Sequence, residues 1–335
     1  MARALALPAI LVAVSRLFRD VQGGLLCPHG SVVCIGAFDG LHLGHQALVG
    51  RARARARELG CASAVLSFEP LPREFFAHGA APARLLLPAA RIHGLTKLGI
   101  DVIGMLRFNT RLAAMSAQAF VESLLVRRLG AREVWVGPGF RFGHGREGDL
   151  ALLQSLGKQH AFTATAIAPV ALAGERVSAS RIRDALAAGD LAGAARLLGR
   201  PYRIEGRVVR GAQLGRKLGY PTANIRLGGR MPALAGIFAT RVHGVGGVPR
   251  ASVASLGTRP TVHGSEPLLE AHLFDFEGDL YGQRIGVEFV HKLRDEQAFA
   301  DLPALVAQMD IDARRAREIL QDCTDPNTPV RKQPA

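Results

Sequence analysis

The fold of the first half of this chain is decided by one stretch, Val32-Val33-Cys34-Ile35-Gly36-Ala37-Phe38-Asp39-Gly40-Leu41-His42-Leu43-Gly44-His45. Its first four residues are apolar and predict a buried strand, and a glycine-rich turn and a helical pattern follow them. Gly36, Gly40 and Gly44 let the backbone approach an anion without obstruction by side chains, and the N–H groups at the start of a helix point toward that anion. The stretch therefore predicts a nucleotide-phosphate site at the end of a strand.

Two histidines, His42 and His45, lie three residues apart at the start of the predicted helix, so both are expected to face the same way. Imidazoles in that position can donate hydrogen bonds to phosphate oxygens and stabilise the charge that develops when a phosphorus atom is attacked. The same spacing could be half of a zinc site, but no third ligand lies close by in the sequence. Ordinary surface or core histidines are a further alternative, and these residues alone leave the interpretations open.

Apolar strand-like runs alternate with helical patterns from residue 31 to residue 198. Such alternation predicts an α/β fold with a parallel sheet covered by helices on both faces, in which ligands bind at the C-terminal ends of the strands. The predicted strands are residues 62–68, 102–106, 133–137 and 163–169, and the predicted helices are residues 45–59, 90–98 and 117–129.

A second phosphate-binding candidate closes this half, Val177-Ser178-Ala179-Ser180-Arg181-Ile182-Arg183, at the start of a helix predicted to run to Leu198. The hydroxyls of Ser178 and Ser180 can cap the helix and donate to phosphate, and Arg183 can offer a bidentate fork. Read alone, this pattern is most often a capped amphipathic helix.

The pattern changes after Gly199-Arg200-Pro201, which breaks the helix. Short β-type segments without intervening helices then predict a closed antiparallel barrel, followed by a helix over residues 302–320. We expect one domain at residues 15–198, a second at 199–322, and a disordered polar tail at 323–335. The predicted barrel strands are residues 204–209, 236–242, 269–274 and 285–289.

The second half carries its own phosphate-binding candidate, residues 211–224. Its glycines free the backbone to wrap phosphates and its lysine can supply charge; a glycine-rich hairpin without a ligand is the plainer alternative. Thr222 and Asn224 offer oxygen ligands that suit Mg²⁺. The phosphate-binding candidates are Gly211, Gly215, Gly219, Lys217, Thr222 and Asn224.

Downstream, Leu269-Glu270-Ala271-His272 alternates so that Glu270 and His272 lie on one face of a strand. An acid on the inward face of a barrel is either a structural ion pair or a general base. The residues alone leave both interpretations open.

The composition of this chain of 335 residues limits the kinds of partner that it is expected to bind. Its formal net charge is +14, which raises the question of a nucleic-acid partner. The basic residues are scattered, and the one dense run, residues 51–57, spreads around a helix rather than along one stripe, so no nucleic-acid partner is expected. No run of eighteen apolar residues appears, so no membrane span is expected. Residues 1–14 are expected to be a loosely attached segment or an over-long start.

Four cysteines show neither Cys-x-x-Cys pairing nor the spacing of metal ligands. Free thiols in a reducing compartment are expected, which predicts a cytoplasmic protein. These residues are Cys27, Cys34, Cys61 and Cys323.

The motifs in combination resemble a known family. Residues 36–45 resemble the Gly-x-Phe-Asp-Gly-x-His-x-Gly-His signature of the nucleotidyltransferase superfamily, and residues 178–183 resemble the Ser-Ser-Thr-x-Ile-Arg motif of one of its branches. Pro221-Thr222-Ala223-Asn224, residues 257–261, Glu270-x-His-x-x-Asp-Phe and Asp279-Leu280-Tyr281-Gly282 resemble the riboflavin kinase barrel, in that order. The chain is similar, over residues 31–320, to the bifunctional bacterial FAD synthetase family.

The resemblance implies a Rossmann-like nucleotidyltransferase domain, then an antiparallel riboflavin kinase barrel with a C-terminal helix. The barrel would phosphorylate riboflavin to FMN with ATP, with Mg²⁺ at Thr222 and Asn224 and with Glu270 as the base. The first domain would join FMN to a second ATP, giving FAD and pyrophosphate, with His42 and His45 stabilising the transition state. Riboflavin, FMN and ATP are the implied partners.

The remaining site residues are also carried over from the resemblance. Nucleotide binding in the first domain is implied for Gly36, Phe38, Asp39, Gly40, Gly44, Ser178, Ser180, Arg181 and Arg183. Flavin binding is implied for Phe68, Pro70, Pro72 and Phe75 in the first domain and for Arg294 and Glu296 in the barrel.

Five residues of the first domain depart from the family pattern, namely Ala37, Leu71, Pro138, Gly139 and Ala179. At Pro138 and Gly139 the family presents acidic or amide side chains. An alternative is therefore a riboflavin kinase whose N-terminal domain binds nucleotide with weak or no catalysis.

Overall fold

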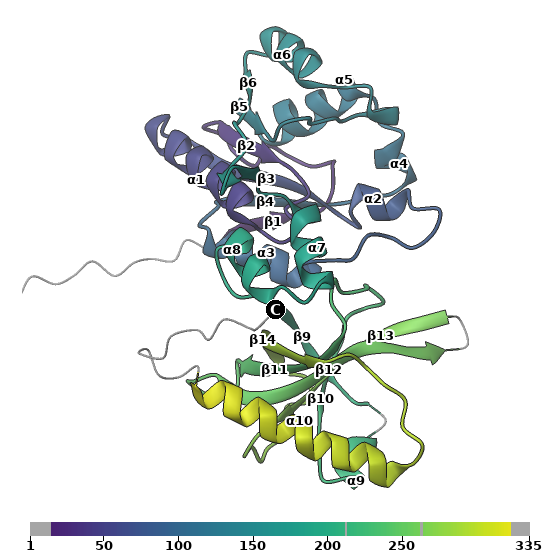
Figure 1. Cartoon of the computed structure of the whole chain (residues 1–335). Coiled ribbons are helices and arrows are strands. Elements are labelled where there is room, and N and C mark those ends of the chain that lie inside the picture. Colours follow the sequence, from purple (N-terminus) through teal and green to yellow (C-terminus); the bar gives the residue numbers. More distant parts are fainter. Residues whose placement is uncertain (1–14, 212, 262–263, 323–335) are drawn as a thin grey trace, which may run out of the picture. The chain divides into compact units, whose positions relative to one another are not determined.

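The computed structural model describes residues 15–322 apart from Ala212, Val262 and His263 (Figure 1). The predictions for residues 1–14 and for the tail at 323–335 lie outside this part of the chain. The described chain divides into two compact units. The first unit holds the residues through Phe38 together with residues 44–77 and 92–170, and the second holds residues 39–43, 78–91 and the chain from Ala171 onward.

A six-stranded parallel sheet forms the centre of the first unit, as predicted, with strand order β1-β4-β3-β2-β5-β6. β2 is buried along its whole length because apolar side chains cover both faces of a central parallel strand. The short edge strand β1 was not predicted, since three residues carry no readable period. The strands are β1 (Arg16–Phe18), β2 (Ser31–Ile35), β3 (Ala62–Glu69), β4 (Val102–Arg107), β5 (Ala131–Val136) and β6 (Thr163–Ala166).

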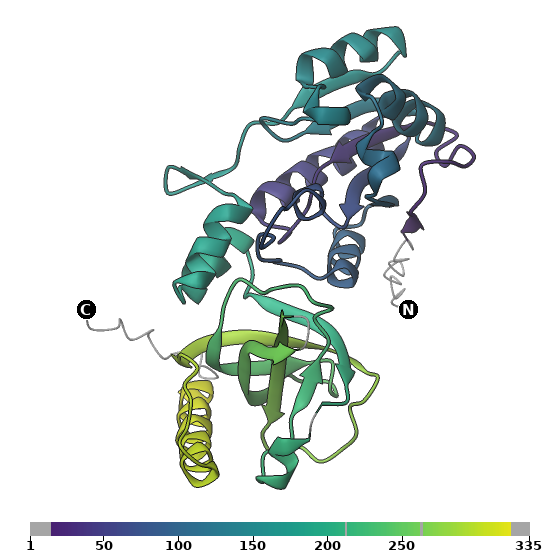
Figure 2. The same ribbon diagram turned by 90° about the vertical axis from the view of Figure 1, so that its right-hand side faces the viewer.

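Helices cover this sheet (Figure 2). α1 (Leu43–Glu58), α3 (Pro88–Lys97) and the helical run from 117 to 128 confirm the three predicted helices, but the last run changes at Val121 from α5 (Ala117–Phe120) into a π-helix, Val121–Arg128. Val121, Leu124 and Leu125 of the π-helix pack in the core with Val33 and Leu66 of the sheet. The shorter helices are α2 (Pro72–Phe75), α4 (Thr110–Ala113), a 3₁₀ turn (His144–Arg146) and α6 (Leu150–Gln159).

The second unit begins with a small hairpin, β7 (Ala171–Leu172) and β8 (Glu175–Arg176), and two helices, α7 (Ala179–Ala187) and α8 (Leu191–Leu198). The prediction of one continuous helix to Leu198 is wrong. Gly189 adopts a left-handed φ of 76°, and the Asp190 carboxylate accepts a 2.7 Å hydrogen bond from Gly193 N, which caps a new helix.

The rest of this unit is a closed antiparallel barrel, as predicted, in the order β10-β13-β12-β11-β14-β9. β10 and β12 were not among the predicted strands. The barrel elements are β9 (Arg203–Val209), α9 (Leu214–Lys217), β10 (Ala223–Ile225), β11 (Gly236–His243), β12 (Arg250–Thr261), β13 (Gly264–Leu273) and β14 (Arg284–Arg294).

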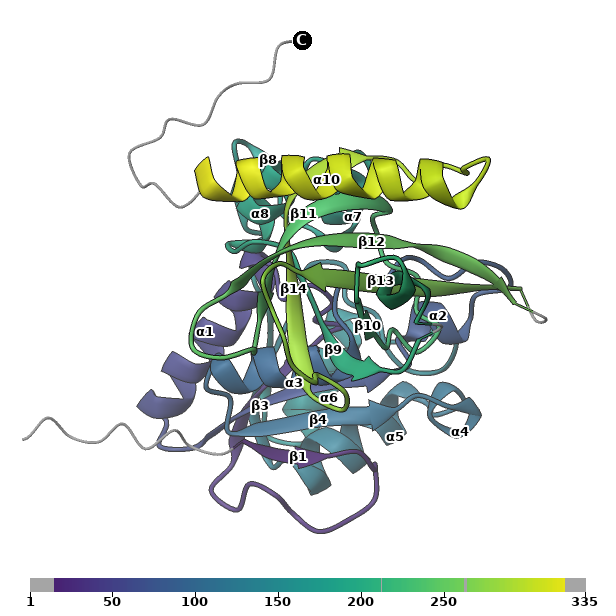
Figure 3. The same cartoon turned by 90° about the horizontal axis from the view of Figure 1, so that it is seen from below.

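The terminal helix α10 (Leu302–Asp322) lies along the barrel against β11, β12 and β14 (Figures 2 and 3). Ala313, Ala316 and Leu320 of this helix form one buried cluster with Phe274 and Leu293 of the barrel. Within the described ranges, no helix combines the length and the apolar character that crossing a membrane would take.

A segment from the first half of the sequence, residues 78–91, also belongs to the second unit. Arg84 N donates a 2.8 Å hydrogen bond to Met231 O, and Arg84 and Pro232 form a parallel bridge. The second unit therefore includes a strand-like contact between chain segments about 150 residues apart.

Candidate active sites

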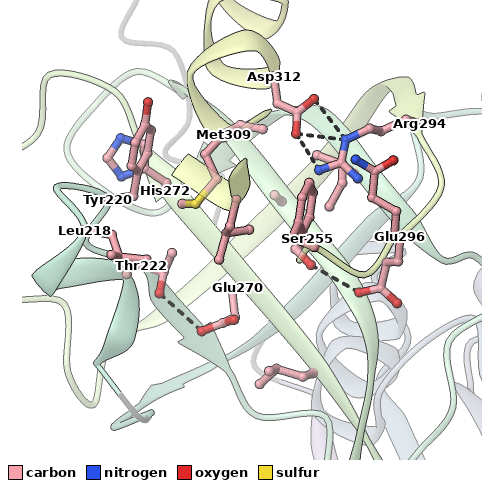
Figure 4. Close-up of a pocket in the computed structure, with 18 of the residues that line it drawn as sticks. Leu218, Tyr220, Thr222, Ser255, Glu270, His272, Arg294, Glu296, Met309 and Asp312 are labelled. Carbon is pink, nitrogen blue, oxygen red and sulfur yellow. Dashed lines mark hydrogen bonds and ion pairs between the residues drawn. The ribbon is translucent and has the colours of Figure 1, made fainter. Parts of the chain in front are cut away.

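A pocket of about 430 Å³ opens between the barrel and α10 (Figure 4). Of the sequence-predicted residues, it is lined by Gly215, Thr222, Asn224, Glu270, Arg294 and Glu296. These residues come from α9, β10 and the residue before it, β13, and the end of β14 with the loop that follows it, so the barrel brings together residues up to 81 positions apart in the sequence.

The centre of the pocket is a polar group of three side chains. Asn224 on β10 pairs in register with Glu270 on β13, which places their side chains on the same face of the sheet. Thr222 Oγ1 donates a 3.3 Å hydrogen bond to Glu270 Oε1, and Asn224 Nδ2 lies 3.4 Å from Thr222 Oγ1. Figure 4 shows Thr222 and Glu270 pointing toward one another.

The glycines beside this group allow close backbone approach. A Cβ added at Gly211 would lie 2.4 Å from Asn224 Oδ1, and one at Gly215 would lie 2.3 Å from Tyr220 O. Gly219 has a φ of 84°, in the left-handed region that favours glycine. Lys217 is exposed on α9 and does not line the pocket.

At the opposite wall, Arg294 is held by Asp312 of α10, with hydrogen bonds of 3.0 Å from Nε and 2.7 Å from Nη2 to Oδ2. Arg294 Nη1 also donates to Asp295 O at 2.9 Å, which orders the loop that carries Glu296. A Cβ on Gly257 would lie 2.0 Å from the Glu296 carboxylate, so glycine there leaves space for that side chain.

Several lining residues were not among the predicted site residues, among them Tyr220, Met309 and Asp312. His272, expected only to share a strand face with Glu270, also lines the pocket. Tyr220 packs edge-on against His272, with ring centroids 5.0 Å apart. Burial, together with a hydrogen bond to Asp310, raises the pKa of Tyr220 to about 12, so its hydroxyl stays protonated. Asp312 could have been noticed as an acidic residue within the helical pattern of residues 302–320. The structure shows that its position is buried.

Among the described residues, no three His, Cys, Asp or Glu side chains gather into a cluster that could hold a metal ion. The donors in the barrel pocket are of another kind. Thr222 Oγ1, Asn224 Oδ1 and the Glu270 carboxylate are hard oxygen ligands, and Mg²⁺ binds through one or two such groups and through substrate phosphates. The residues present therefore fit Mg²⁺.

In the first half of the sequence, Asp39 organises the glycine-rich loop of the second unit. Its side chain is 1% exposed and accepts hydrogen bonds from Leu85 N at 3.1 Å and Leu86 N at 3.0 Å. Arg183 Nη2 forms a 2.5 Å ion pair with Asp39 Oδ2, and Arg183 Nε donates to Ala83 O at 2.6 Å. Protein groups thus use two of the five N–H donors of the Arg183 guanidinium.

His42 follows Gly40 and Leu41, both of which have left-handed φ values, 89° and 46°. α1 begins at Leu43, so His42 immediately precedes the helix and His45 lies in its first turn. Burial lowers the pKa of His42 to about 4, so its imidazole is neutral at pH 7 and donates from only one nitrogen.

In the first unit, Gly36 follows β2, and a Cβ on it would lie 3.3 Å from the Phe38 ring. Phe38 is fully buried with a φ of 51°, and its ring centroid lies 5.1 Å from that of His45. Gly44 and His45 lie in the first turn of α1, where backbone N–H groups have no partner one helical turn earlier in the same helix.

Ser178 is the N-cap of α7, and its Oγ accepts a 3.4 Å hydrogen bond from Arg181 N. The predicted capping role is confirmed for Ser178, whereas Ser180 lies inside α7 and does not cap it. Arg181 forms an ion pair with Glu175, and Ser180 is exposed.

The predicted flavin-side loop of the first unit is strongly aromatic. Phe108 packs edge-on against Phe68 and Phe75, with ring centroids 5.7 and 5.2 Å apart. Pro70 has a cis peptide bond, and Pro72 is the first residue of α2.

Comparisons with known proteins confirm the resemblance in both halves. Residues 26–181 match the family model of FAD synthetase, and residues 198–320 match that of riboflavin kinase. A bifunctional riboflavin kinase/FMN adenylyltransferase from Pseudomonas fluorescens is 48% identical over 293 residues, covering 87% of this chain and 93% of the relative. A protein of the same name from Escherichia coli K12 is 44% identical over 304 residues, covering 90% and 97%.

Similarity extends to a solved structure. A crystal structure described as a macrolide-efflux protein from Streptococcus pneumoniae matches with a TM-score of 0.73 at 29% identity, covering 90% of this chain and 98% of that one. From the two domain matches and the two full-length relatives, the chain belongs to the family of bifunctional riboflavin kinases/FMN adenylyltransferases.

Proposed function

We propose that this protein makes FAD from riboflavin in two transferase steps, with the barrel pocket as the kinase site. The observation that carries the proposal is the hydrogen-bonded group of Thr222, Asn224 and Glu270 at the centre of that pocket. Thr222 Oγ1 and Asn224 Oδ1 would hold Mg²⁺, which when bound neutralises charge on the triphosphate of ATP.

Glu270 acts as the general base of the first step. Its carboxylate takes the proton of the ribityl hydroxyl as that oxygen attacks the γ-phosphorus of ATP, and ADP leaves. The hydrogen bond from Thr222 Oγ1 fixes the direction of the carboxylate. Arg294 and Glu296 lie across the same pocket and would orient the flavin.

The second step belongs to the N-terminal half. A phosphate oxygen of FMN attacks the α-phosphorus of a second ATP, and pyrophosphate leaves. Neutral His42, His45 and the N–H groups of the first turn of α1 would donate hydrogen bonds to the phosphate oxygens. Asp39 would hold the loop in shape through Arg183, with Ser178, Ser180 and Arg181 nearby in sequence at the start of α7.

The test is to incubate purified protein with riboflavin, ATP and MgCl₂ and to separate FMN from FAD over time by chromatography. We expect FMN first and FAD after it, and neither in excess EDTA. A second reaction that starts from FMN isolates the adenylyl transfer. If riboflavin is never phosphorylated although FMN is adenylylated, the assignment of the barrel pocket fails.

We also propose that the adenylyltransferase lies before residues 198/199 and the kinase after them. We further propose that the protein is cytoplasmic and has no nucleic-acid or membrane partner. The free thiols of Cys27, Cys34 and Cys61 support a reducing compartment. The separation of the two family matches, at residues 181 and 198, supports the division.

A further inference from the structure

A second cavity, of about 540 Å³, lies in the first unit at the C-terminal ends of β1 and β4. Arg19, Arg107, Arg111 and Arg127 line it, and we name it the arginine pocket. Asp20 is the only acidic residue among those that line it. None of these residues belongs to the sites predicted for nucleotide or flavin.

The four arginines come from four separate elements. Arg19 follows β1, Arg107 ends β4, Arg111 lies in α4 and Arg127 lies in the π-helix. Within the part of the chain that the structure describes, no carboxylate forms an ion pair with any of them. Four like charges gathered around one cavity repel one another, and a bound anion removes that cost.

The walls of the arginine pocket are held in place. Arg107 N donates a 3.2 Å hydrogen bond to Arg19 O, which fixes the start of the loop after β1. Arg128 donates to Gly24 O and fixes its end, and a Cβ on Gly23 would collide with the Arg128 guanidinium at 2.3 Å. The cavity is thus formed before any ligand binds, which reduces the entropy that binding costs.

One of the four arginines is also oriented. Arg127 Nη2 donates to Ser123 Oγ at 3.1 Å and Arg127 Nε donates to Glu122 O at 3.3 Å, so neutral groups hold the guanidinium and leave its charge uncompensated. Ser123 and Arg127 both lie in the π-helix and both line the cavity. π-helical segments are rare and occur frequently at functional sites.

We propose that the arginine pocket binds a small oligophosphate anion, either free pyrophosphate or the phosphate chain of a nucleotide. Guanidinium groups match phosphate oxygens with paired hydrogen bonds, and sites at the C-terminal ends of parallel strands are where α/β sheets bind ligands. The volume of the cavity is too large for a single phosphate and accommodates a chain of two or three. All four arginines are exposed, so the anion can reach them from solvent.

The experiment is calorimetric titration of the full chain with sodium pyrophosphate, without added metal, for the parent and for the double variant Arg107→Gln/Arg111→Gln. The active sites also bind phosphates, so the measured quantity is the number of equivalents and the affinity of each. We expect the double variant to lose one equivalent, or to bind it at least about tenfold more weakly. The control Arg51→Gln/Arg57→Gln removes two exposed arginines from α1 and should leave binding unchanged.

A parallel titration with ATP distinguishes free pyrophosphate from a nucleotide as the ligand. If the arginine pocket binds nucleotides, the double variant should also lose one equivalent of bound ATP. FMN and FAD formation at saturating substrate should be unchanged in the double variant. Each single variant is measured as well, so that a folding defect in the double variant does not decide the result. Equal binding by parent and variants would overturn the proposal, and so would a short RNA that binds these arginines more tightly than pyrophosphate.

Discussion

Asp312 accepts hydrogen bonds from two nitrogens of Arg294, and this pair joins the middle of α10 to the end of β14 at the wall of the kinase pocket. The Asp312 side chain is 8% exposed, so the pair is shielded from solvent. Gln308 Nε2 adds a 3.0 Å hydrogen bond to the same carboxylate. The arrangement positions Arg294 without placing Asp312 in the chemistry.

Asp312→Asn should therefore raise the KM for riboflavin about tenfold while kcat for FMN formation changes much less. The amide carries no charge, and its NH₂ group replaces an oxygen, Oδ1, that accepts from Arg294 Nε and Gln308 Nε2, so Arg294 loses its fixed orientation. Steady-state kinetics with varied riboflavin measure the effect. The matched control is Asp275→Asn, which breaks the exposed Arg317–Asp275 pair between the same helix and the barrel and should leave KM unchanged. A fall in kcat alone would contradict the positioning role.

Glu270→Gln should reduce FMN formation by about 10²–10⁴, because the amide keeps the shape of the side chain but cannot take a proton. Adenylylation of supplied FMN should proceed at the parent rate, which serves as the control for folding. Quenched-flow or fixed-time assays of both steps measure the outcome. Near-normal kinase turnover in this variant would exclude Glu270 as the base.

His42→Ala and His45→Ala should each lower FAD formation from FMN by about 10²–10³, in line with the loss of other donors that stabilise developing charge. The kinase step should be spared, since neither residue lines the barrel pocket. Both rates are measured on the same preparation. If each variant makes FAD as fast as the parent, the phosphate role of these imidazoles is wrong.

His42 should also give the protein a distinct pH dependence of stability. Its folded pKa of about 4 is below its ordinary value of 6.5, so the neutral imidazole contributes stability that is fully present above pH 6.5 and is lost as the pH falls toward 4. The loss is on the order of 3 kcal/mol at most. Urea midpoints at pH 7.5 and 4.5 should fall further for the parent than for His42→Gln. His144→Gln, at an exposed histidine, should behave as the parent does.

The architecture was predictable because both halves have strong periodicity. Alternating strands and helices imply a parallel sheet, and uninterrupted short strands imply a barrel. β10 was missed because its three residues follow a run of glycines that reads as a loop. The helix to Leu198 was predicted as one element because a single Gly-Asp pair, residues 189–190, is a weak signal against the apolar period around it.

The site residues were predictable only where a local motif carries the chemistry. Glu270, Thr222 and Asn224 stand in such motifs and do meet in one pocket. The Asp39–Arg183 pair joins residues 144 positions apart, and no local pattern shows that the arginine is engaged by a carboxylate. Gly139 has a left-handed φ of 73°, a conformation that an acidic side chain at this position would strain. Glycine in place of the family's acidic or amide residue at position 139 therefore goes with a loop backbone that favours glycine.

Residues 39–43 and 78–91 belong to the unit that contains the barrel. This membership matters when genes of this family are cut or recombined between the two domains. A gene fragment that begins after Leu198 encodes every motif of the kinase yet omits the segment that pairs with Met231. A fragment that ends there leaves Gly40 without Arg200 and Arg84 without Met231. Recombination between related genes at that boundary would therefore exchange a whole activity. It would also bring Arg84 from one parent against Met231 and Pro232 from the other.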